Sequence, residues 1–151
     1  MKGQVSTEYL VILAVVLVVA LVVVYLVGGF SGLGAGSLET QSKSYWGSTS
    51  PFAVTTVRVS GTAMDLQMVN NDLEQLILTD ISLGANSIYA NSSSFTSGES
   101  KVITAVLPGG VVPCTVSGAP YTYNNVVITY TKGTIAGVKQ SGTKSFVGKC
   151  S

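Results

Sequence analysis

The stretch QVSTEYLVILAVVLVVALVVVYLV, residues 4–27, decides the fold of this chain. After a short polar head, the residues from Leu10 to Val27 include no charge, glycine or proline. At about 1.5 Å rise per residue, these positions span roughly 27 Å as a helix, close to the hydrocarbon thickness of a bilayer. Because the run is apolar on every face, its whole circumference must be buried in lipid or among other apolar helices.

A carboxylate, Glu8, stands at the entrance to this apolar run. One interpretation is that Glu8 lies among lipid head groups and marks where the membrane span begins. The preceding residues offer another, because Met1-Lys2-Gly3 forms a very short, positively charged leader. An ordinary secretory leader carries no Glu inside it and loses its apolar region on cleavage.

This N-terminus resembles that of the archaeal type IV pilins with a class III signal peptide. In that family a Lys-Gly leader is cleaved before Gln, and Ser, Glu and the apolar run follow. The resemblance implies cleavage between Gly3 and Gln4 and an apolar helix that stays in the mature protein. The family's positions are filled here by Lys2, Gly3, Gln4, Ser6, Glu8, Tyr9 and Leu10. The residues that it implicates in assembly are Gln4, Ser6, Glu8 and Leu10.

The resemblance also implies partners and a location. A prepilin peptidase would remove the leader, and an assembly ATPase and a membrane platform protein would drive polymerisation of identical copies. The subunit would be surrounded by lipid in the cytoplasmic membrane before assembly and would then join an extracellular filament at the cell surface. Tyr45-Trp46 followed by Pro51-Phe52 adds to the resemblance.

Residues 28–36 are rich in glycine, and each glycine weakens a helix by roughly 1 kcal/mol. This segment predicts a break or hinge, unless packing carries the helix through it. Ser37 is then expected as the N-cap of a short amphipathic helix, Leu38–Trp46. The aromatic end of that helix, Tyr45-Trp46, would pack on the following domain or, alternatively, lie at the membrane surface.

From Pro51 onward the pattern changes to short strands separated by turns rich in Gly, Asn and Ser. A change of phase near Thr55-Thr56 indicates a β-bulge. Residues 91–94 are expected to form a polar loop. Such a series of short strands is typical of an all-β sandwich or barrel. The expected strand segments are 52–59, 64–69, 76–83, 88–89, 101–107, 111–116, 121–131, 135–140 and 144–147.

The predicted fold class is therefore α+β, with a long N-terminal apolar helix followed by an all-β, sandwich-like head. Residues 1–3 are the leader, and residues 4–36 are the membrane or filament-core helix with its glycine-rich hinge. Residues 37–151 are the β-rich extracellular head, which is long enough for one small core.

Both cysteines, Cys114 and Cys150, follow the apolar helix. In a translocated head they would lie in an oxidising compartment, where we expect them to pair rather than remain two buried thiols. Their disulfide would tie the end of the chain to its middle and contribute about 3–4 kcal/mol in the chain-entropy model.

Asn91-Ser92-Ser93 is an N-glycosylation sequon in the polar loop that we expect to be exposed. Asn91 is therefore a candidate modification site. Because such short sequons also arise by chance, the sequence leaves its occupancy open.

The composition argues against several classes of function. The absence of His excludes His-based triads and His metal sites, and scattered lysines with a net charge of +1 form no basic surface for nucleic acid. We therefore expect no enzymatic activity, metal or cofactor. One oxygen-rich group has ligand atoms of the kind that calcium prefers, but its spacing is not that of an EF-hand and a turn explains it better. That group is Asn70, Asn71, Asp72, Glu74 and Asp80.

The function expected from the resemblance is that of a pilin, the structural subunit of an archaeal type IV-like adhesion pilus. One alternative is a signal-anchored single-pass surface protein, or a minor pilin that does not form the filament body. Another is an exported β-domain protein cleaved near Ala35-Gly36. A mature N-terminus at Gln4 would favour the pilin, one near Ser37 the exported protein, and an intact Met1 the anchor.

Overall fold

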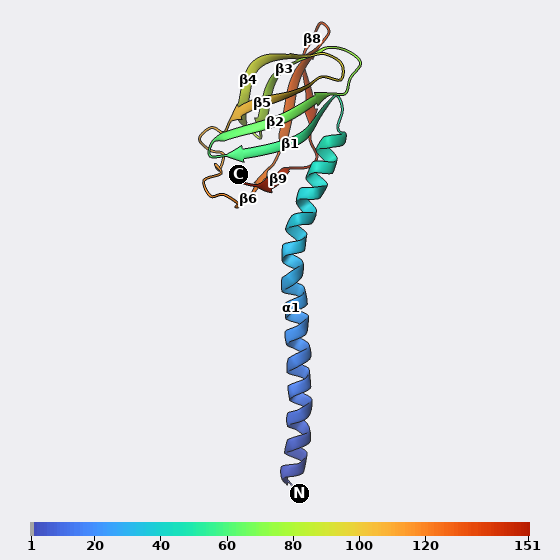
Figure 1. Ribbon diagram of the computed structural model, residues 1–151, viewed down its shortest axis with the longest axis vertical. Coiled ribbons are helices and arrows are strands. Elements are labelled where there is room, and N and C mark those ends of the chain that lie inside the picture. The colour runs from blue at the N-terminus through green and yellow to red at the C-terminus, as the bar shows by residue number, and fades with distance from the viewer. Residues whose placement is uncertain (1) are drawn as a thin grey trace. The chain divides into compact units, whose positions relative to one another are not determined.

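Figure 1 shows the computed structural model, which describes the backbone of residues 2–151 and the side chains of residues 6–26 and 36–151. Within these residues one helix, α1 (Lys2–Ser48), is followed by nine strands. The chain divides into two compact units between Ser37 and Leu38. The first unit is helical, and the second contains the last turns of α1 and all the strands.

The predicted break at residues 28–36 is not present, because α1 continues through them without interruption. A glycine costs roughly 1 kcal/mol relative to alanine, yet it keeps the N–H that the helical ladder needs, which a proline would remove. Ser37 therefore lies inside the helix rather than at an N-cap. The side chains of residues 27–35 lie outside the described part, and a hinge motion at these glycines stays a prediction.

Trp46, near the C-terminal end of α1, is buried in the core of the head with 1% of its surface exposed. Its ring packs on Phe146 at a centroid distance of 4.7 Å, and its indole N–H donates to the carbonyl oxygen of Lys144 at 3.2 Å. Tyr45 packs half-buried beside it. The aromatic end of the helix therefore packs on the head, as one of the two sequence interpretations predicts.

Leu38, the first residue of the segment predicted at Leu38–Trp46, is 56% exposed. Ser42 is buried, and its hydroxyl donates to the carbonyl oxygen of Ser145 at 2.7 Å. Leu38 stands about two turns before Trp46, roughly 12 Å along the helix axis.

The strands pair only in antiparallel fashion and form three sheets across the described residues. The orders are β1-β2-β5, β4-β3-β7-β8 and β6-β9. The strands are β1 (Phe52–Ser60), β2 (Ala63–Asn70), β3 (Leu76–Leu83), β4 (Asn86–Phe95), β5 (Ser100–Val106), β6 (Pro120–Tyr123), β7 (Val126–Lys132), β8 (Ile135–Ser141) and β9 (Phe146–Lys149).

The sheets share one hydrophobic core, to which each contributes the inward side chains of its strands. On β2 the alternate residues Met64, Leu66 and Met68 are at most 1% exposed. Phe52 of β1 meets Phe95 of β4 edge to face, with ring centroids 5.2 Å apart, and so joins the two larger sheets. The predicted α+β class, an apolar helix followed by a β-rich head, is confirmed.

Local patterns predicted several elements well. The bounds of β3 are those expected, and the bulge predicted near Thr55-Thr56 is confirmed by a register shift between Val54 and Thr56. The phase change was visible in the sequence because β1 turns its apolar residues to the same core on both sides of the bulge.

Two predicted strands are absent or divided in the structure. Residues 111–116 form no strand and contribute only an isolated bridge between Gly61 and Cys114, because Pro113 lacks the N–H that a ladder needs. The segment predicted at 121–131 is two strands, β6 and β7, in different sheets. They are separated at Asn125, whose φ of 54° lies in the left-handed region.

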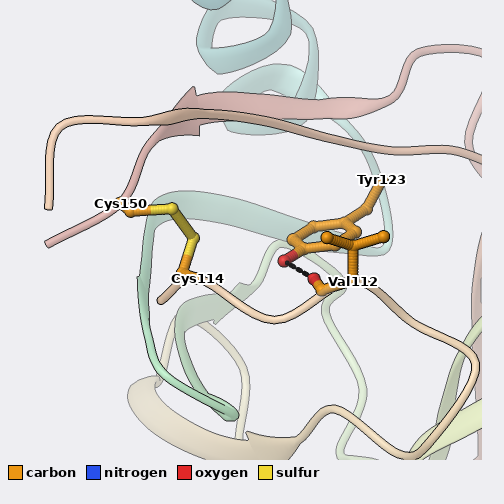
Figure 2. The surroundings of a disulfide bond; sticks show 4 residues. All are labelled: Val112, Cys114, Tyr123 and Cys150. Carbon is orange, nitrogen blue, oxygen red and sulfur yellow. Dashed lines mark hydrogen bonds between the residues drawn. A yellow bond between two sulfur atoms is a disulfide. The ribbon is translucent and has the colours of Figure 1, made fainter. Parts of the chain in front are cut away.

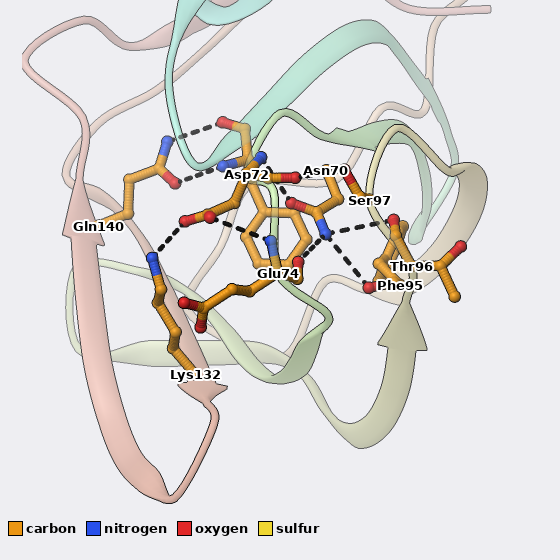
Figure 3. Close-up of polar contacts among 9 residues, drawn as sticks. Asn70, Asp72, Glu74, Phe95, Thr96, Ser97, Lys132 and Gln140 are labelled. Atoms are coloured by element: carbon orange, nitrogen blue, oxygen red, sulfur yellow. Dashed lines mark hydrogen bonds and ion pairs between the residues drawn. The ribbon is translucent and has the colours of Figure 1, made fainter.

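Gln140 of β8 links the two larger sheets through its side chain (Figure 3). Its amide nitrogen donates to the carbonyl oxygen of Phe52 at 2.8 Å, and its amide oxygen accepts the Phe52 N–H at 3.0 Å. No strand of the described chain pairs with Phe52 on this edge of β1. The Gln140 side chain satisfies the N–H and carbonyl oxygen of Phe52 there instead.

Candidate functional site

The stretch Ser6–Leu26 of α1 is the candidate assembly surface, with 21 residues and a mean hydropathy of 3.2. Its large apolar side chains are between 41% (Leu13) and 81% (Tyr25) exposed, so the described part of the chain leaves them uncovered. Burying one Val or Leu side chain is worth about 1.5–3 kcal/mol, so leaving this surface in water would cost on the order of 20 kcal/mol. Such a surface is suited to lipid or to other apolar helices.

The polar head of this helix carries the residues that the sequence implicates in assembly. Ser6, Glu8 and Leu10 are exposed, while Gly3 and Gln4 belong to the helical backbone with their surroundings outside the described side chains. Helix positions four apart share a face, so Ser6 shares a face with Leu10, and Glu8, midway between them, lies on another. The implicated positions therefore do not gather into one patch on a single helix.

Cys114 and Cys150 form the disulfide that the sequence predicts, with their Cα atoms 5.4 Å apart (Figure 2). Their sequence separation of 36 corresponds to about 4 kcal/mol in the chain-entropy model. Backbone hydrogen bonds hold the same end of the chain, from Cys150 N–H to Ala119 and from Ser151 N–H to Val59. A disulfide at this position fits an extracellular location.

A hollow of about 400 Å³ opens beside this bond, and we call it the disulfide hollow. Tyr121 and Tyr123 stack there with ring centroids 5.2 Å apart, and the Tyr123 hydroxyl donates to the carbonyl oxygen of Val112 at 2.8 Å (Figure 2). Burial, with a smaller contribution from the charge of Glu39, raises the pKa of Tyr121 to about 12. The hollow's lining includes Val112, Cys114, Val116, Pro120, Tyr123 and Cys150.

The oxygen-rich residues at the end of β2 and directly after it form a hydrogen-bonded turn (Figure 3). The fully buried Asn70 donates its side-chain amide to three backbone carbonyl oxygens at 2.8–3.2 Å and accepts the Asp72 N–H at 2.9 Å. The Asp72 carboxylate accepts the Glu74 N–H at 3.2 Å and pairs with Lys132 Nζ at 2.6 Å. The Lys132 ammonium, helped by the Glu74 N–H, holds the pKa of Asp72 below its usual range.

The fifth residue of the group considered for calcium, Asp80, lies on β3 and accepts a hydrogen bond from the Ser87 hydroxyl. In the part of the chain that the structure describes, no cluster of three or more His, Cys, Asp or Glu side chains could hold a metal ion. In this turn the charge of the Asp72 carboxylate is paired with the Lys132 ammonium.

Asn91 lies in a strand, β4, and the polar loop predicted at residues 91–94 is wrong. The sequence suggested a loop because these residues are polar, but β4 is an edge strand whose outer face is exposed to solvent. Asn91 and Ser92 fall where the pairing of β4 with β3 shifts register, and both are exposed. The exposure expected for the sequon is therefore present, on a bulge of an edge strand.

No protein-family model, curated protein or solved structure matches the chain. The structure itself defines the class of architecture. It is an N-terminal apolar helix, long enough to cross a membrane, followed by a β-rich head with a disulfide near its C-terminus. Such a helix could anchor the chain in a membrane or act as a signal sequence.

Proposed function

We propose that the chain is the structural subunit of an archaeal type IV-like adhesion pilus, polymerised through its N-terminal helix. The motif between Lys2 and Leu10 supports this by its resemblance to pilins. The observation that carries the proposal is the surface from Ser6 to Leu26, which is apolar all round and uncovered by the rest of the described chain. A prepilin peptidase, an assembly ATPase and a membrane platform protein complete the proposed system.

The apolar helix has two chemically similar environments in this proposal. In the cytoplasmic membrane it is solvated by lipid, and in the filament the helices of neighbouring copies replace that lipid. Extraction then exposes little apolar surface to water, so the cost of on the order of 20 kcal/mol is avoided at both stages. Growth is open-ended when one surface of a subunit binds a different surface of the next copy.

Glu8 gives the assembly step its polar element. Cleavage before Gln4 would create an α-amino group with a reference pKa of about 7.7–8.0. Inside an apolar bundle a lone ammonium or a lone carboxylate is costly, so each is stabilised by the other. The amino group of an incoming copy pairs with Glu8 of a copy already in place, and this contact fixes the axial register.

The variants Glu8→Leu and Glu8→Gln test the pairing. We expect both to be cleaved and inserted normally, while the amount of subunit in sheared filaments falls at least about tenfold for Glu8→Leu and less for Glu8→Gln, in line with a loss of about 1.4 kcal/mol or more. Val11→Leu, on the same exposed stretch, is the matched control that leaves the charge in place. Normal filament yield from Glu8→Leu would return Glu8 to the role of a membrane head-group residue.

The uncovered helix equally supports a signal-anchored surface protein or a minor pilin outside the filament body. The mass of the mature N-terminus separates these functions. A chain beginning at Gln4 supports a pilin, an intact Met1 supports the anchor, and a start near Ser37 supports an exported protein without the helix. Recovery of the chain as the main component of sheared filaments separates the major from the minor pilin.

A further inference from the structure

Strand β4 is the longest strand of the described chain, with ten residues, and it lies at the edge of its sheet. It pairs with β3 on one side, and its other side presents backbone N–H and C=O groups to the surroundings. Such an edge can pair with a strand of another molecule. Proteins usually protect it with a charged side chain, a proline, a bulge or a short length.

The other strands that end a sheet each carry a charged residue or a proline. They are β1 with Arg58, β5 with Lys101, β8 with Lys139, β6 with Pro120 and β9 with Lys149. Strand β4 carries neither, from its first residue to its last. Lys101 reaches across from β5 to the carbonyl oxygen of Ser94, but Ser94 is the last residue but one of β4. The middle of this edge therefore depends on something else for its protection.

The middle of β4 carries the sequon Asn91-Ser92-Ser93. Asn91 and Ser92 together oppose the single residue Thr79 of β3, because the register shifts between Leu78 and Asp80. They form a bulge at this edge, and both are exposed. The sequon thus lies at the one interruption of a long, uncharged edge.

The side chain of Asn91 is available for modification. Its amide oxygen accepts the Ser92 N–H at 2.8 Å, and among the described residues its amide nitrogen donates to no protein atom. The amide nitrogen of Asn71, in contrast, donates to the carbonyl oxygen of Thr49 at 3.2 Å. A bulky group on the Asn91 amide nitrogen would therefore displace no contact of the fold.

We propose that Asn91 carries an N-linked glycan and that this glycan protects the edge of β4. A sugar attached there is bulky and hydrated, so it keeps a second strand from approaching the exposed backbone. The protection matters most where many heads lie close together, as they would in a filament. The modification requires only that the head be translocated, which rests on the proposed function, and does not require polymerisation.

The sugar comes from a donor of a stated class, a glycan linked to a lipid through phosphate. The amide nitrogen of Asn91 forms a bond to the anomeric carbon of the sugar, and the bond from that carbon to the phosphate oxygen breaks. The nitrogen gives up one proton to the transferring enzyme, and the lipid phosphate leaves. Ser93 supplies the third-position hydroxyl that makes Asn91 an acceptor.

Mass spectrometry of the full chain, isolated from the membranes and filaments of its native cells, tests the modification. Trypsin releases Asn91 within residues 59–101, and fragmentation of that peptide locates any added mass. We expect a sugar mass on Asn91 in the unmutated chain and in Ser92→Ala, which keeps the sequon. We expect none in Asn91→Gln or in Ser93→Ala, the matched variant one residue away that destroys the sequon.

The protective role is tested by sedimentation of the full chain after extraction in detergent. Asn91→Gln should raise the aggregated fraction at least about threefold, whereas Asn91→Lys, which also lacks the glycan but puts a charge on the edge, should stay within about twofold of the unmutated chain. An unchanged fraction for Asn91→Gln, or an equal rise for Asn91→Lys, would overturn this role.

The modification and the pilus proposal fail separately. An unmodified Asn91, or sugar at another residue only, would overturn the modification even if the chain is the main component of sheared filaments. A glycosylated Asn91 in a chain that keeps Met1 and never enters filaments would leave the modification standing and remove the pilus.

Discussion

Gly142 and Trp46 test how the end of the helix is joined to the head. A Cβ atom at Gly142 would lie 2.2 Å from two ring carbons of Trp46, far inside van der Waals contact. The ring cannot move away easily, because it packs on Phe146 and its N–H is bonded to Lys144. Gly142 is not among the residues with positive φ, so an alanine there causes no backbone strain. The collision with the Trp46 ring is then the only cause of destabilisation that we expect.

We therefore expect Gly142→Ala to lower the free energy of unfolding of the head by about 3 kcal/mol, the upper part of the range for overpacked cores. Trp46→Ala removes the ring and costs about 3–5 kcal/mol by itself. In that background Gly142→Ala should cost less than about 0.5 kcal/mol, because the atoms with which it collides are gone. The coupling between the two sites is then about 2–3 kcal/mol.

The assay is denaturant unfolding of the fragment 38–151, which is one compact unit. Circular dichroism monitors the unfolding, because Trp46→Ala removes the chain's only tryptophan and with it the fluorescence signal. Gly109→Ala is the matched control: its Cβ would have open space, and we expect a change within about 0.5 kcal/mol. An equal cost of Gly142→Ala with and without the Trp46 ring would refute the reasoning, since the collision would not be the cause.

Three further outcomes follow from the disulfide, the Asp72 turn and the leader. Cys150→Ser should cost the head about 4 kcal/mol, or about 15 °C in Tm, and equal melting of the unmutated head with and without reductant would contradict this. The Lys132 ammonium lowers the pKa of Asp72, so the ion pair stabilises the head above about pH 4. This stabilisation is lost as the pH falls further and Asp72 is protonated. Melting curves between pH 2 and 7 should show that loss, and Asp72→Asn should reduce it; a variant with the full acid response would remove the assignment. Gly3→Val should block cleavage of the leader and leave subunits in the membrane, whereas mature protein of normal size would count against the proposed site.

The sequence alone predicts the features that depend on residues close together along the chain. An uninterrupted apolar run is sufficient to predict the stretch Ser6–Leu26, and alternation with Gly and Asn turns is sufficient for β1 to β3. The disulfide could be predicted because the chain has only two cysteines. Local preference failed at residues 28–36, where the helical ladder continues through the glycines, and at Asn91, where strand pairing holds a polar segment.

The rest depends on contacts between distant parts of the chain. Gln140 is hydrogen-bonded to Phe52 at a sequence separation of 88 residues, and Trp46 to Lys144 at a separation of 98. No local sequence pattern could therefore predict either hydrogen bond. Gly142 looks like an ordinary turn glycine until the ring of Trp46 is seen against it. The disulfide hollow likewise exists only because the register of β6 with β9 brings the tyrosines to the cysteines.

Under the proposed function, the helix and the head must divide the work of assembly between them. The stretch Ser6–Leu26 is apolar around its whole circumference, so it packs equally well in many rotations and heights, because apolar attraction is not directional. It can hold copies together but cannot specify how they are arranged. Directional contacts must do that; the carboxylate of Glu8 at the polar head offers one, and the surface of the head must supply the others. Loss of the Glu8 carboxylate should therefore reduce how many subunits enter a filament.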